Sequence, residues 1–370
     1  MAKEESVIQE KVKQQLEEIA KKFLEIKKSL HIGTESLTPL NYKEELEKFF
    51  NSSTYNPQYI YKKREFKDIP KIIDGFKSEI DTLLLPDELK EYFLEFLDDQ
   101  KNLFLTKSSI GTDKFSDNAH KLFDWGTDRL DLLLTNTPKV EFTMHITHRM
   151  QNAGKIKERF EMVLNKYSIN GFDVNIDAFS PHIINVGRQS VNIGCDIKRF
   201  ECNVDRLVIH EIESHVLQAE NARRGSSILS ELSKYGNQHL YGEGLAVYNE
   251  VMTRKITPSA FEMYFSRIKA VRLLHKSFRE IFDSLSETLT PQRAFVMTYR
   301  VKRGLSDTSA PGGFPKDASY LLGFHEVENL VAEKFPKKLL YATRSPILSS
   351  LLSKYGLLNT ENVLTPKFQR

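Results

Sequence analysis

The chain has 370 residues, and 53 lysines and arginines against 50 aspartates and glutamates give it a formal net charge of +3. A charge this small gives no support for nucleic-acid binding, and two cysteines are too few for a disulfide framework or a zinc ribbon. The charged first residues and the lack of an apolar run of about 18 residues predict a cytoplasmic protein, neither secreted nor membrane-spanning.

Residues 1–137 are predicted to form an N-terminal helical region. Apolar residues recur near the helical period from Val7 to Ile26, and lysine and glutamate occupy the other face. Packing against other helices is a more common use of such a face than binding to a membrane, because its charges are mixed. Further helices are expected at residues 42–50, 69–84 and 88–104.

The pattern changes after Pro138, and residues 138–370 are predicted to form a second region that mixes helices with strands. A helix is expected at residues 155–166. An edge strand of a small sheet here could pair with an extended peptide, or the strands could simply cover a core. Short stretches of alternating apolar residues predict strands at residues 140–147, 172–177, 183–186 and 190–194.

The most informative stretch runs from Leu207 to Asn221 and contains His210, Glu211 and His215 as an H-E-x-x-x-H motif. Its apolar neighbours predict a buried helix, and two imidazoles beside a carboxylate are the ligands and the base of a zinc hydrolase. The alternative is a helix with two unrelated histidines, because so short a motif also arises by chance.

The spacing of the two histidines requires an irregular helix. Residues four apart on an α-helix differ by roughly 40° around its axis, whereas residues five apart differ by roughly 140°. The second angle is too large for both side chains to bind one ion. A π-bulge or a widened turn would absorb the extra residue, and we predict such a distortion between Glu211 and His215.

The motif from Tyr241 to Glu250 predicts the third metal ligand. It begins with two glycines that we expect to be flexible and continues into a helix predicted at residues 245–254. A catalytic zinc commonly binds two histidines and one carboxylate and keeps one position for water, so Glu243 is the predicted ligand. The alternative for Glu243 is an acidic residue that complements the helix dipole. Glu250 is a second candidate ligand, or it accepts a hydrogen bond from a ligand imidazole.

Residues 256–300 are predicted to be largely helical and to end in the basic cluster Arg300, Lys302 and Arg303. The stretch 304–315 that follows is rich in glycine, proline and serine, and long loops of this kind are often lids or binding loops. A guanidinium here could hold the terminal carboxylate of a peptide, although a solvated basic strip is the simpler interpretation. A last clear helix is expected at residues 316–335.

Three motifs in this order resemble one family. The motifs H-E-I-x-x-H-x-x-x-x-x-N at 210–221, E-G-L-A at 243–246 and R-G…D-T-S-x-P-G-x-F-x-K-D…Y-L-x-G at 303–323 resemble the microtubule-associated tyrosine carboxypeptidases and their bacterial relatives with a Q-E-G-L-A motif. The resemblance covers roughly residues 170–325, and three motifs together are far more specific than one. It departs from the bacterial motif at Gly242, where that motif has glutamine, and this predicts a different pocket beside the site.

The resemblance implies a zincin-like metallopeptidase core within an α+β, mainly helical fold, with the small sheet before the H-E-x-x-x-H helix. It implies Zn²⁺ bound by His210, His215 and Glu243, with Glu211 as general base. The candidates for binding the substrate are Arg300, Arg303 and Tyr320, and Asp317 also matches a motif position. The candidates for contacts behind the metal ligands are Asn221 and Glu250.

The predicted function is that of a zinc metallocarboxypeptidase, which removes a C-terminal residue, tyrosine by the resemblance, from a peptide or protein. A zinc-activated water would attack the peptide bond while Glu211 takes its proton and returns it to the leaving amine. Two alternatives remain, a zinc endopeptidase and a regulatory or peptide-binding protein that keeps the fold without turnover. The family implies tubulin as a partner, but the chain lacks the long basic N-terminal extension expected of a microtubule binder.

Overall fold

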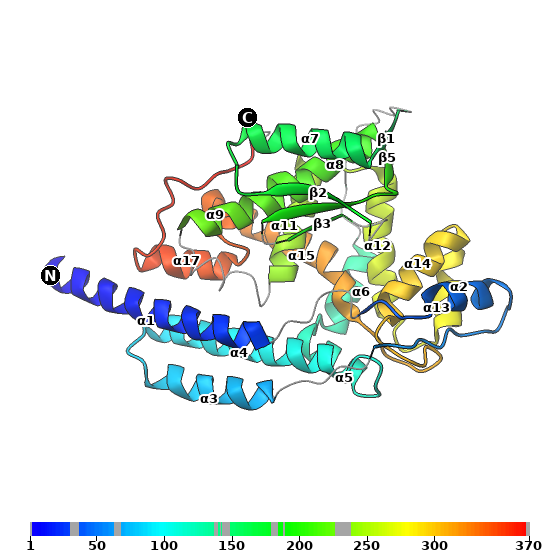
Figure 1. Ribbon diagram of the computed structural model, residues 1–370, viewed down its shortest axis with the longest axis horizontal. Coiled ribbons are helices and arrows are strands. Elements are labelled where there is room, and N and C mark those ends of the chain that lie inside the picture. The colour runs from blue at the N-terminus through cyan, green and yellow to red at the C-terminus, as the bar shows by residue number, and fades with distance from the viewer. Residues whose placement is uncertain are drawn as a thin grey trace. The chain divides into compact units, whose positions relative to one another are not determined.

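The computed structural model describes residues 2–29, 37–62, 68–136, 140, 142, 149–178, 184–187, 189–225 and 238–367. It is mainly helical with two small sheets (Figure 1), which confirms the predicted α+β class. Contacts between residues divide the chain into two compact units. Unit 1 contains residues 1–17, 138–261 and 323–370, and unit 2 contains residues 18–137 and 262–322.

The two units interleave along the chain. Residues 262–322 group with residues 18–137, whereas the sequence predicted an N-terminal region 1–137 and a catalytic region 138–370. Compactness alone does not establish which segments fold independently. The two predicted domains therefore stay a prediction, and each unit is described by itself.

Unit 1 contains both sheets. In the larger one, β2 (Asp173–Asp177) pairs in parallel with β4 (Ser190–Gly194), which pairs antiparallel with β3 (Ile184–Val186). In the smaller one, β1 (Met150–Asn152) pairs antiparallel with β5 (Lys198–Phe200). The strands predicted at 172–177, 183–186 and 190–194 are confirmed. The strand predicted at 140–147 lies largely outside the described residues.

The larger sheet has one apolar and one polar face, as the alternation of its residues predicts. Val174, Val191 and Ile193 are buried on the inner face. On the outer face Asn192 lies between the side chains of Asn175 and Asn185 and is hydrogen-bonded to both. The inner face thus fixes the side of the sheet on which the helices pack.

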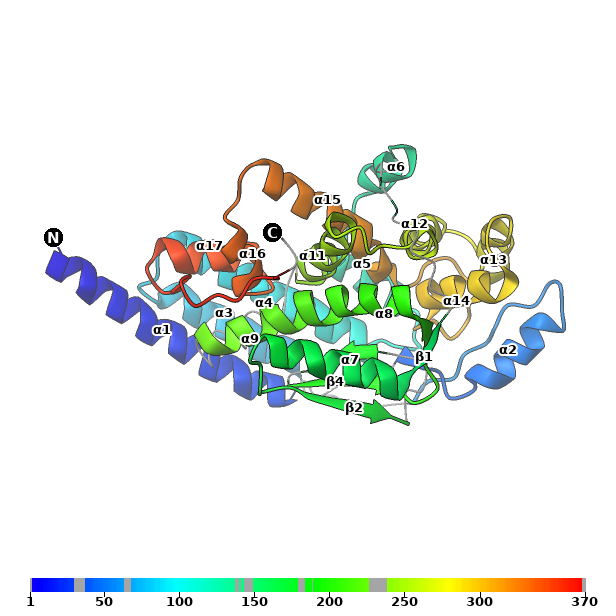
Figure 2. The same ribbon diagram turned by 90° about the horizontal axis from the view of Figure 1, so that it is seen from above.

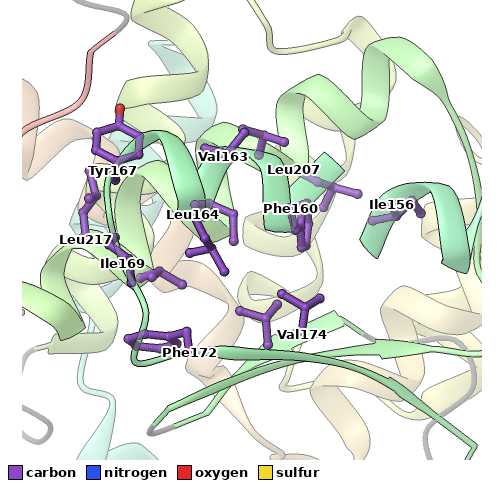
Figure 3. Packing of buried hydrophobic residues seen from close by; sticks show 14 of the residues in the cluster. Ile156, Phe160, Val163, Leu164, Tyr167, Ile169, Phe172, Val174, Leu207 and Leu217 are labelled. Carbon is purple, nitrogen blue, oxygen red and sulfur yellow. The ribbon is translucent and has the colours of Figure 1, made fainter. Parts of the chain in front are cut away.

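Helix α7 (Ala153–Lys166) packs against this inner face and against the helix of the His-Glu motif, which β3 also contacts. Figure 2 shows α7 between the strands and the run formed by α8 (Glu201–Leu207), η2 (Val208–Val216) and α9 (Leu217–Gly225). Figure 3 shows Phe160 and Leu164 of α7 in one apolar cluster with Val174 of β2 and with Leu207 and Leu217 of the helical run. The motif therefore lies on a buried, rigid support.

The glycines of the second motif serve a close helix contact. Helix α11 (Gln238–Met252) begins before them, so the flexible start predicted for the helix at Leu245 is wrong. A β-carbon at Gly244 would collide with the backbone of Gly323 in α15 (Ser319–Ala332), and one at Gly323 would collide with Leu240. Both positions need glycine because two backbones touch here. The remaining helices of unit 1 are α16 (Lys337–Ala342) and α17 (Pro346–Lys354).

Unit 2 is helical and has an aromatic core. Phe49, Phe278 and Phe295 are buried, and their ring centroids lie 5.0–5.2 Å apart. Phe23, in the part of α1 (Ala2–Ser29) that belongs to this unit, packs against Phe96 at 4.9 Å. The other helices are α2 (Tyr42–Phe50), α3 (Ile69–Thr82), α4 (Asp87–Ser108), α5 (Phe115–Leu122), α6 (Thr127–Thr135), α12 (Pro258–Arg272), α13 (Phe278–Ser286), α14 (Pro291–Lys302) and η3 (Pro315–Ala318). Among the described residues, no helix is long and apolar enough to cross a membrane.

The loop at residues 304–315 is fixed by contacts within unit 2. The buried ammonium of Lys302 donates a hydrogen bond to the Ala310 carbonyl at 2.7 Å, and the Thr308 hydroxyl donates to the Pro57 carbonyl at 2.7 Å. Gly304 has a φ of 98° and packs against the ring of Phe115, which leaves no room for a side chain. These contacts are those of a packed loop and not of an open lid.

Candidate metal centre

Residues Val208–Val216 form a π-helix, so the distortion predicted between Glu211 and His215 is confirmed. In a π-helix the hydrogen bonds join residues five apart, and such residues therefore lie on the same side. The rings of His210 and His215 have centroids 5.0 Å apart. The π-helix thus absorbs the extra residue of the motif and brings the two imidazoles together.

A buried chain of hydrogen bonds supports the wide turn. The hydroxyl of Ser214 donates to the Ile209 carbonyl at 2.8 Å, and the amide of Asn249 donates to the Ser214 oxygen at 2.8 Å. The Tyr341 hydroxyl in turn donates to the Asn249 carbonyl oxygen at 2.8 Å. Buried polar groups that are all satisfied fix one arrangement of their helices, here η2, α11 and α16.

Glu243, on α11, faces both imidazoles. Its Oε2 lies 3.4 Å from His210 Nε2 and 3.5 Å from His215 Nε2. A ligand atom of Glu211 lies within 4.8 Å of ligand atoms of both histidines. In a tetrahedral zinc site with bonds of 2.0–2.2 Å, neighbouring ligand atoms are about 3.3–3.6 Å apart. The two histidines and Glu243 therefore have the donor types of a zinc site, and Glu243 lies at ligand spacing from each imidazole.

Glu250, seven residues after Glu243 on α11, contacts His210 on its other ring nitrogen. Glu250 Oε1 lies 2.7 Å from His210 Nδ1, and the guanidinium of Arg206 donates to the same oxygen at 2.7 Å. Of its two predicted roles, this geometry favours that of an acceptor behind the ligand, since Nε2 is left for the metal. A carboxylate in this place fixes the tautomer and the orientation of the ring.

The site holds more carboxylates than permanent positive charges. Burial lowers the pKa of His210, but hydrogen bonds to Glu243 and Glu250 outweigh it and raise the pKa to about 10. Burial also raises the pKa of Glu211. Three carboxylates thus surround two imidazoles, with Arg206 as a permanent positive charge beside them. A divalent metal would supply the positive charge that the proton on His210 otherwise provides.

His215 differs from His210 in the surroundings of its Nδ1 ring nitrogen. Its Nδ1 is buried without a hydrogen-bond partner among the described residues. A β-carbon at Gly242 would lie 4.0 Å from His215 Cε1 and 3.9 Å from Gln218 Oε1, which are ordinary contact distances. The glutamine that the bacterial motif has at this position would therefore approach His215.

Asn221 was predicted to make a contact behind the metal ligands, but its hydrogen bonds go to Tyr341 and Leu364. Its amide nitrogen donates to the carbonyls of Tyr341 at 2.9 Å and Leu364 at 2.8 Å, and its oxygen accepts from the Leu364 N–H at 2.8 Å. Within the part of the chain described here, no hydrogen bond joins it to His210 or His215. Its place at the end of the motif therefore reflects docking of the C-terminal segment.

Sequence reasoning missed three polar residues that support the site, Arg206, Ser214 and Asn249. A signal existed for Arg206, which lies four residues before His210 and so on the same side of a helix. Ser214 lies inside the motif, but its use depends on the π-helix. Asn249 is adjacent to Glu250, and its partner Tyr341 is too distant in sequence to leave a pattern.

The residues predicted to bind substrate lie in unit 2. The guanidinium of Arg300 binds Asp317 through two nitrogens, and Arg303 Nη2 lies 3.7 Å from the same carboxylate. Tyr320 stacks on Tyr264 with ring centroids 5.3 Å apart. The structure thus brings Arg300 and Arg303 together around Asp317.

Comparison with known proteins agrees with the resemblance of the three motifs. A sequence model of the family described as "Microtubule-associated tyrosine carboxypeptidase" matches residues 47–345. The proteins named "Microtubule-associated tyrosine carboxypeptidase 1" from Mus musculus and Homo sapiens are each 32% identical over 126 residues, 32% of this chain and 26% of theirs. "Putative tyrosine carboxypeptidase MATCAP2" of Mus musculus is 25% identical over 341 residues, 90% of this chain and 58% of that protein.

The extent of these matches differs. The aligned part is about a quarter of the first relatives' length and more than half of the last one's. The family model, however, covers most of this chain, including the π-helix, α11 and the loop after α14. The chain therefore belongs to the microtubule-associated tyrosine carboxypeptidase family.

Proposed function

We propose that this protein is a zinc-dependent carboxypeptidase with a zincin-like core. It would remove the C-terminal residue of a peptide or protein, and the names of its relatives suggest tyrosine. The observation that carries the proposal is the convergence of His210 Nε2 and His215 Nε2 on Glu243 Oε2 at 3.4 and 3.5 Å. Glu211 adds what a structural zinc site does not need, a further carboxylate beside the ligands.

Each residue has a distinct role in the proposed reaction. His210, His215 and Glu243 would hold the zinc, which supplies a polarised water and an electrophile for the peptide carbonyl. Glu211 accepts the proton of the water as the new C–O bond forms, and it gives this proton to the amine nitrogen as the C–N bond breaks. The raised pKa of Glu211, caused by burial, suits a group that must both accept and donate a proton near neutral pH.

The sheet offers a way to hold the substrate. Among the described strands β3 lies at an edge of the β2-β4-β3 sheet and contacts η2. An extended peptide can add to such an edge through main-chain hydrogen bonds, without a requirement for particular side chains. Binding of this kind would serve an endopeptidase equally well, so the distinction must come from the peptide terminus.

The deciding experiment compares peptides with free and amidated C-termini. Mass spectrometry should show loss of one residue, tyrosine first, from the free form and no cleavage of the amide. Cleavage of both forms at internal bonds would indicate an endopeptidase instead. No cleavage of either, with zinc bound, would indicate a peptide-binding protein. The first protein substrates to test are those that end in tyrosine, tubulin included. The predicted compartment is the cytoplasm, so cytoplasmic proteins should be tested first.

Two variants separate metal binding from chemistry. His210→Ala should lose bound zinc and all cleavage, because two ligands hold the ion far more weakly than three. Glu211→Gln should keep zinc and lose cleavage, because an amide accepts no proton. His325→Ala is the matched control, a histidine that also precedes a glutamate but pairs on the surface with Glu328. Full turnover in Glu211→Gln would reject the assigned role.

A further inference from the structure

Two arginines of unit 2 pair with one buried carboxylate, and a third acts on it by its charge. Asp317 of η3 is only 1% exposed. Arg300 of α14 holds it through Nε and Nη2, with Nη2 at 2.9 Å from Oδ1, and Arg303 Nη2 lies 3.7 Å from the same oxygen. Arg267 of α12 also lowers the pKa of Asp317 by its charge. The group therefore carries three positive charges against one negative charge.

Two of these arginines have hydrogen-bond donors without acceptors. Nε and Nη1 of Arg267 and Nε of Arg303 are buried with no partner among the described residues. Arg300, in contrast, is committed to Asp317. A guanidinium stays protonated in a protein, so this excess charge cannot be relieved by loss of a proton. Buried donors and charges without partners are costly, and an external oxyanion would compensate both.

Aromatic rings hold the guanidinium of Arg267 in place. Its central carbon lies 4.0 Å from the ring centroid of Tyr320 and 5.2 Å from that of Tyr264, and these two rings stack on each other. Arg303 lies 5.2 Å from the ring of Phe314. Planar guanidinium groups fixed in this way present parallel N–H donors, which match the two oxygens of a carboxylate or phosphate.

We propose that Arg267 and Arg303, positioned by Asp317 and Tyr320, form a binding site for one oxyanion, a carboxylate or a phosphate. This assignment moves the predicted anion contact from Arg300 to Arg267. The inference depends on the proposed function only if the bound anion is the terminal carboxylate of a peptide.

The test measures binding and not cleavage. Melting temperature and calorimetry are recorded with acetate and with inorganic phosphate against chloride at equal ionic strength. At least one oxyanion should bind saturably to the unaltered protein. Arg267→Gln and Arg303→Gln should each bind it at least about tenfold more weakly, the loss expected for one charge-assisted hydrogen bond. Both variants should fold, because each removes an excess charge and leaves the pair of Arg300 and Asp317 intact.

Two controls make the result specific. Arg293→Gln alters another arginine of α14, one that pairs with Glu262 on the surface, and should bind the oxyanion like the unaltered protein. Arg303→Lys keeps the charge but lacks the planar fork, so it should bind less well than arginine. The inference would be overturned if neither oxyanion bound saturably. It would also be overturned if Arg267→Gln and Arg303→Gln bound the oxyanion as tightly as the unaltered protein.

A peptide arm identifies the source of the anion. Glu211→Gln protein is titrated with a tyrosine-ending peptide in its free and amidated forms. Preference for the free form, lost in Arg267→Gln, assigns the site to a peptide terminus, whereas binding of phosphate alone assigns it to phosphate. Because no cleavage is required, an inactive protein that binds oxyanions would contradict the proposed function and leave this inference standing.

Discussion

The two units each contain a buried charged cluster, and the clusters have opposite excess charge. Around His210 in unit 1, the carboxylates of Glu211, Glu243 and Glu250 outnumber the one guanidinium of Arg206. Around Asp317 in unit 2, three guanidiniums outnumber one carboxylate. The two clusters also differ in their ability to adapt, because imidazoles and carboxylates can gain or lose protons near neutral pH and guanidiniums cannot.

This difference indicates how a ligand is recognised in each place. In unit 1 hydrogen bonds to Glu243 and Glu250 raise the pKa of His210 to about 10, so a proton on this ring balances part of the negative charge. In unit 2 only an anion from outside can balance the charge. Unit 1 is therefore expected to be sensitive to metal and proton together, and unit 2 to anions.

Removal of the carboxylate from the unit 2 cluster should have the largest effect. Asp317→Asn leaves three guanidiniums without a counter-charge, and breaking a buried pair in this way costs about 3–5 kcal/mol. Urea unfolding should show this loss, and phosphate should restore part of it. Asp131→Asn, which alters an exposed partner of Arg272, should change stability little. Equal stability of the two variants would show that solvent already balances the cluster.

A smaller effect is expected behind the metal ligand in unit 1. Glu250→Gln keeps the shape of the side chain but removes the charge that orients His210, and such changes lower metal affinity about 10–100-fold. Competition with a chelator of known zinc affinity measures it. The same substitution at Glu328, on the surface of α15, should leave the affinity unchanged. Unaltered affinity in Glu250→Gln would mean that packing alone orients the ring.

The pH dependence of the unit 2 cluster should show only a part of the loss expected for Asp317→Asn. Burial raises the pKa of Asp317, but Arg300, Arg267 and Arg303 outweigh it and hold the pKa well below the ordinary value of 3.8. A lowered pKa stabilises the folded state fully above that ordinary value, and this contribution is lost as the pH falls through the folded value. The stability difference between the unaltered protein and Asp317→Asn should therefore shrink from about pH 5 to about pH 2. A difference that is constant over this range would contradict it.

Segments whose apolar residues follow a helical or strand period could be predicted from the sequence, and segments that depend on distant partners could not. The predicted helix at residues 42–50 and the strand at 190–194 match α2 and β4, because their patterns are set by the face that they bury. Helices α5 and α6 and strands β1 and β5 were missed, since they depend on partners elsewhere in the chain. The sequence around Glu243 led to a wrong prediction of flexible glycines. Their contact with α15 could not be foreseen, because it leaves no pattern in the neighbouring residues.

The two charged clusters also differ in how far they could be predicted from the sequence. His210, His215 and Glu243 could be proposed as partners from spacing and ligand chemistry, and the π-helix followed from the mismatch of five residues with an α-helical turn. Arg267 could not, because it lies fifty residues before Asp317 and no motif includes it. Which arginine would lack an acceptor depends on the folded arrangement and not on residue type.

The π-helix also fixes the angular phase of the chain that follows it. Deletion of one residue between Glu211 and His215 would produce the shorter H-E-x-x-H spacing, which an α-helix accommodates without distortion. It would also turn α9 by about 100° relative to its surroundings. Gln218 would then leave the Leu340 carbonyl, and Asn221 would leave Leu364. Deletion of one residue therefore cannot by itself convert this family's motif into the shorter one. The contacts of α9 require the orientation that the longer spacing gives it.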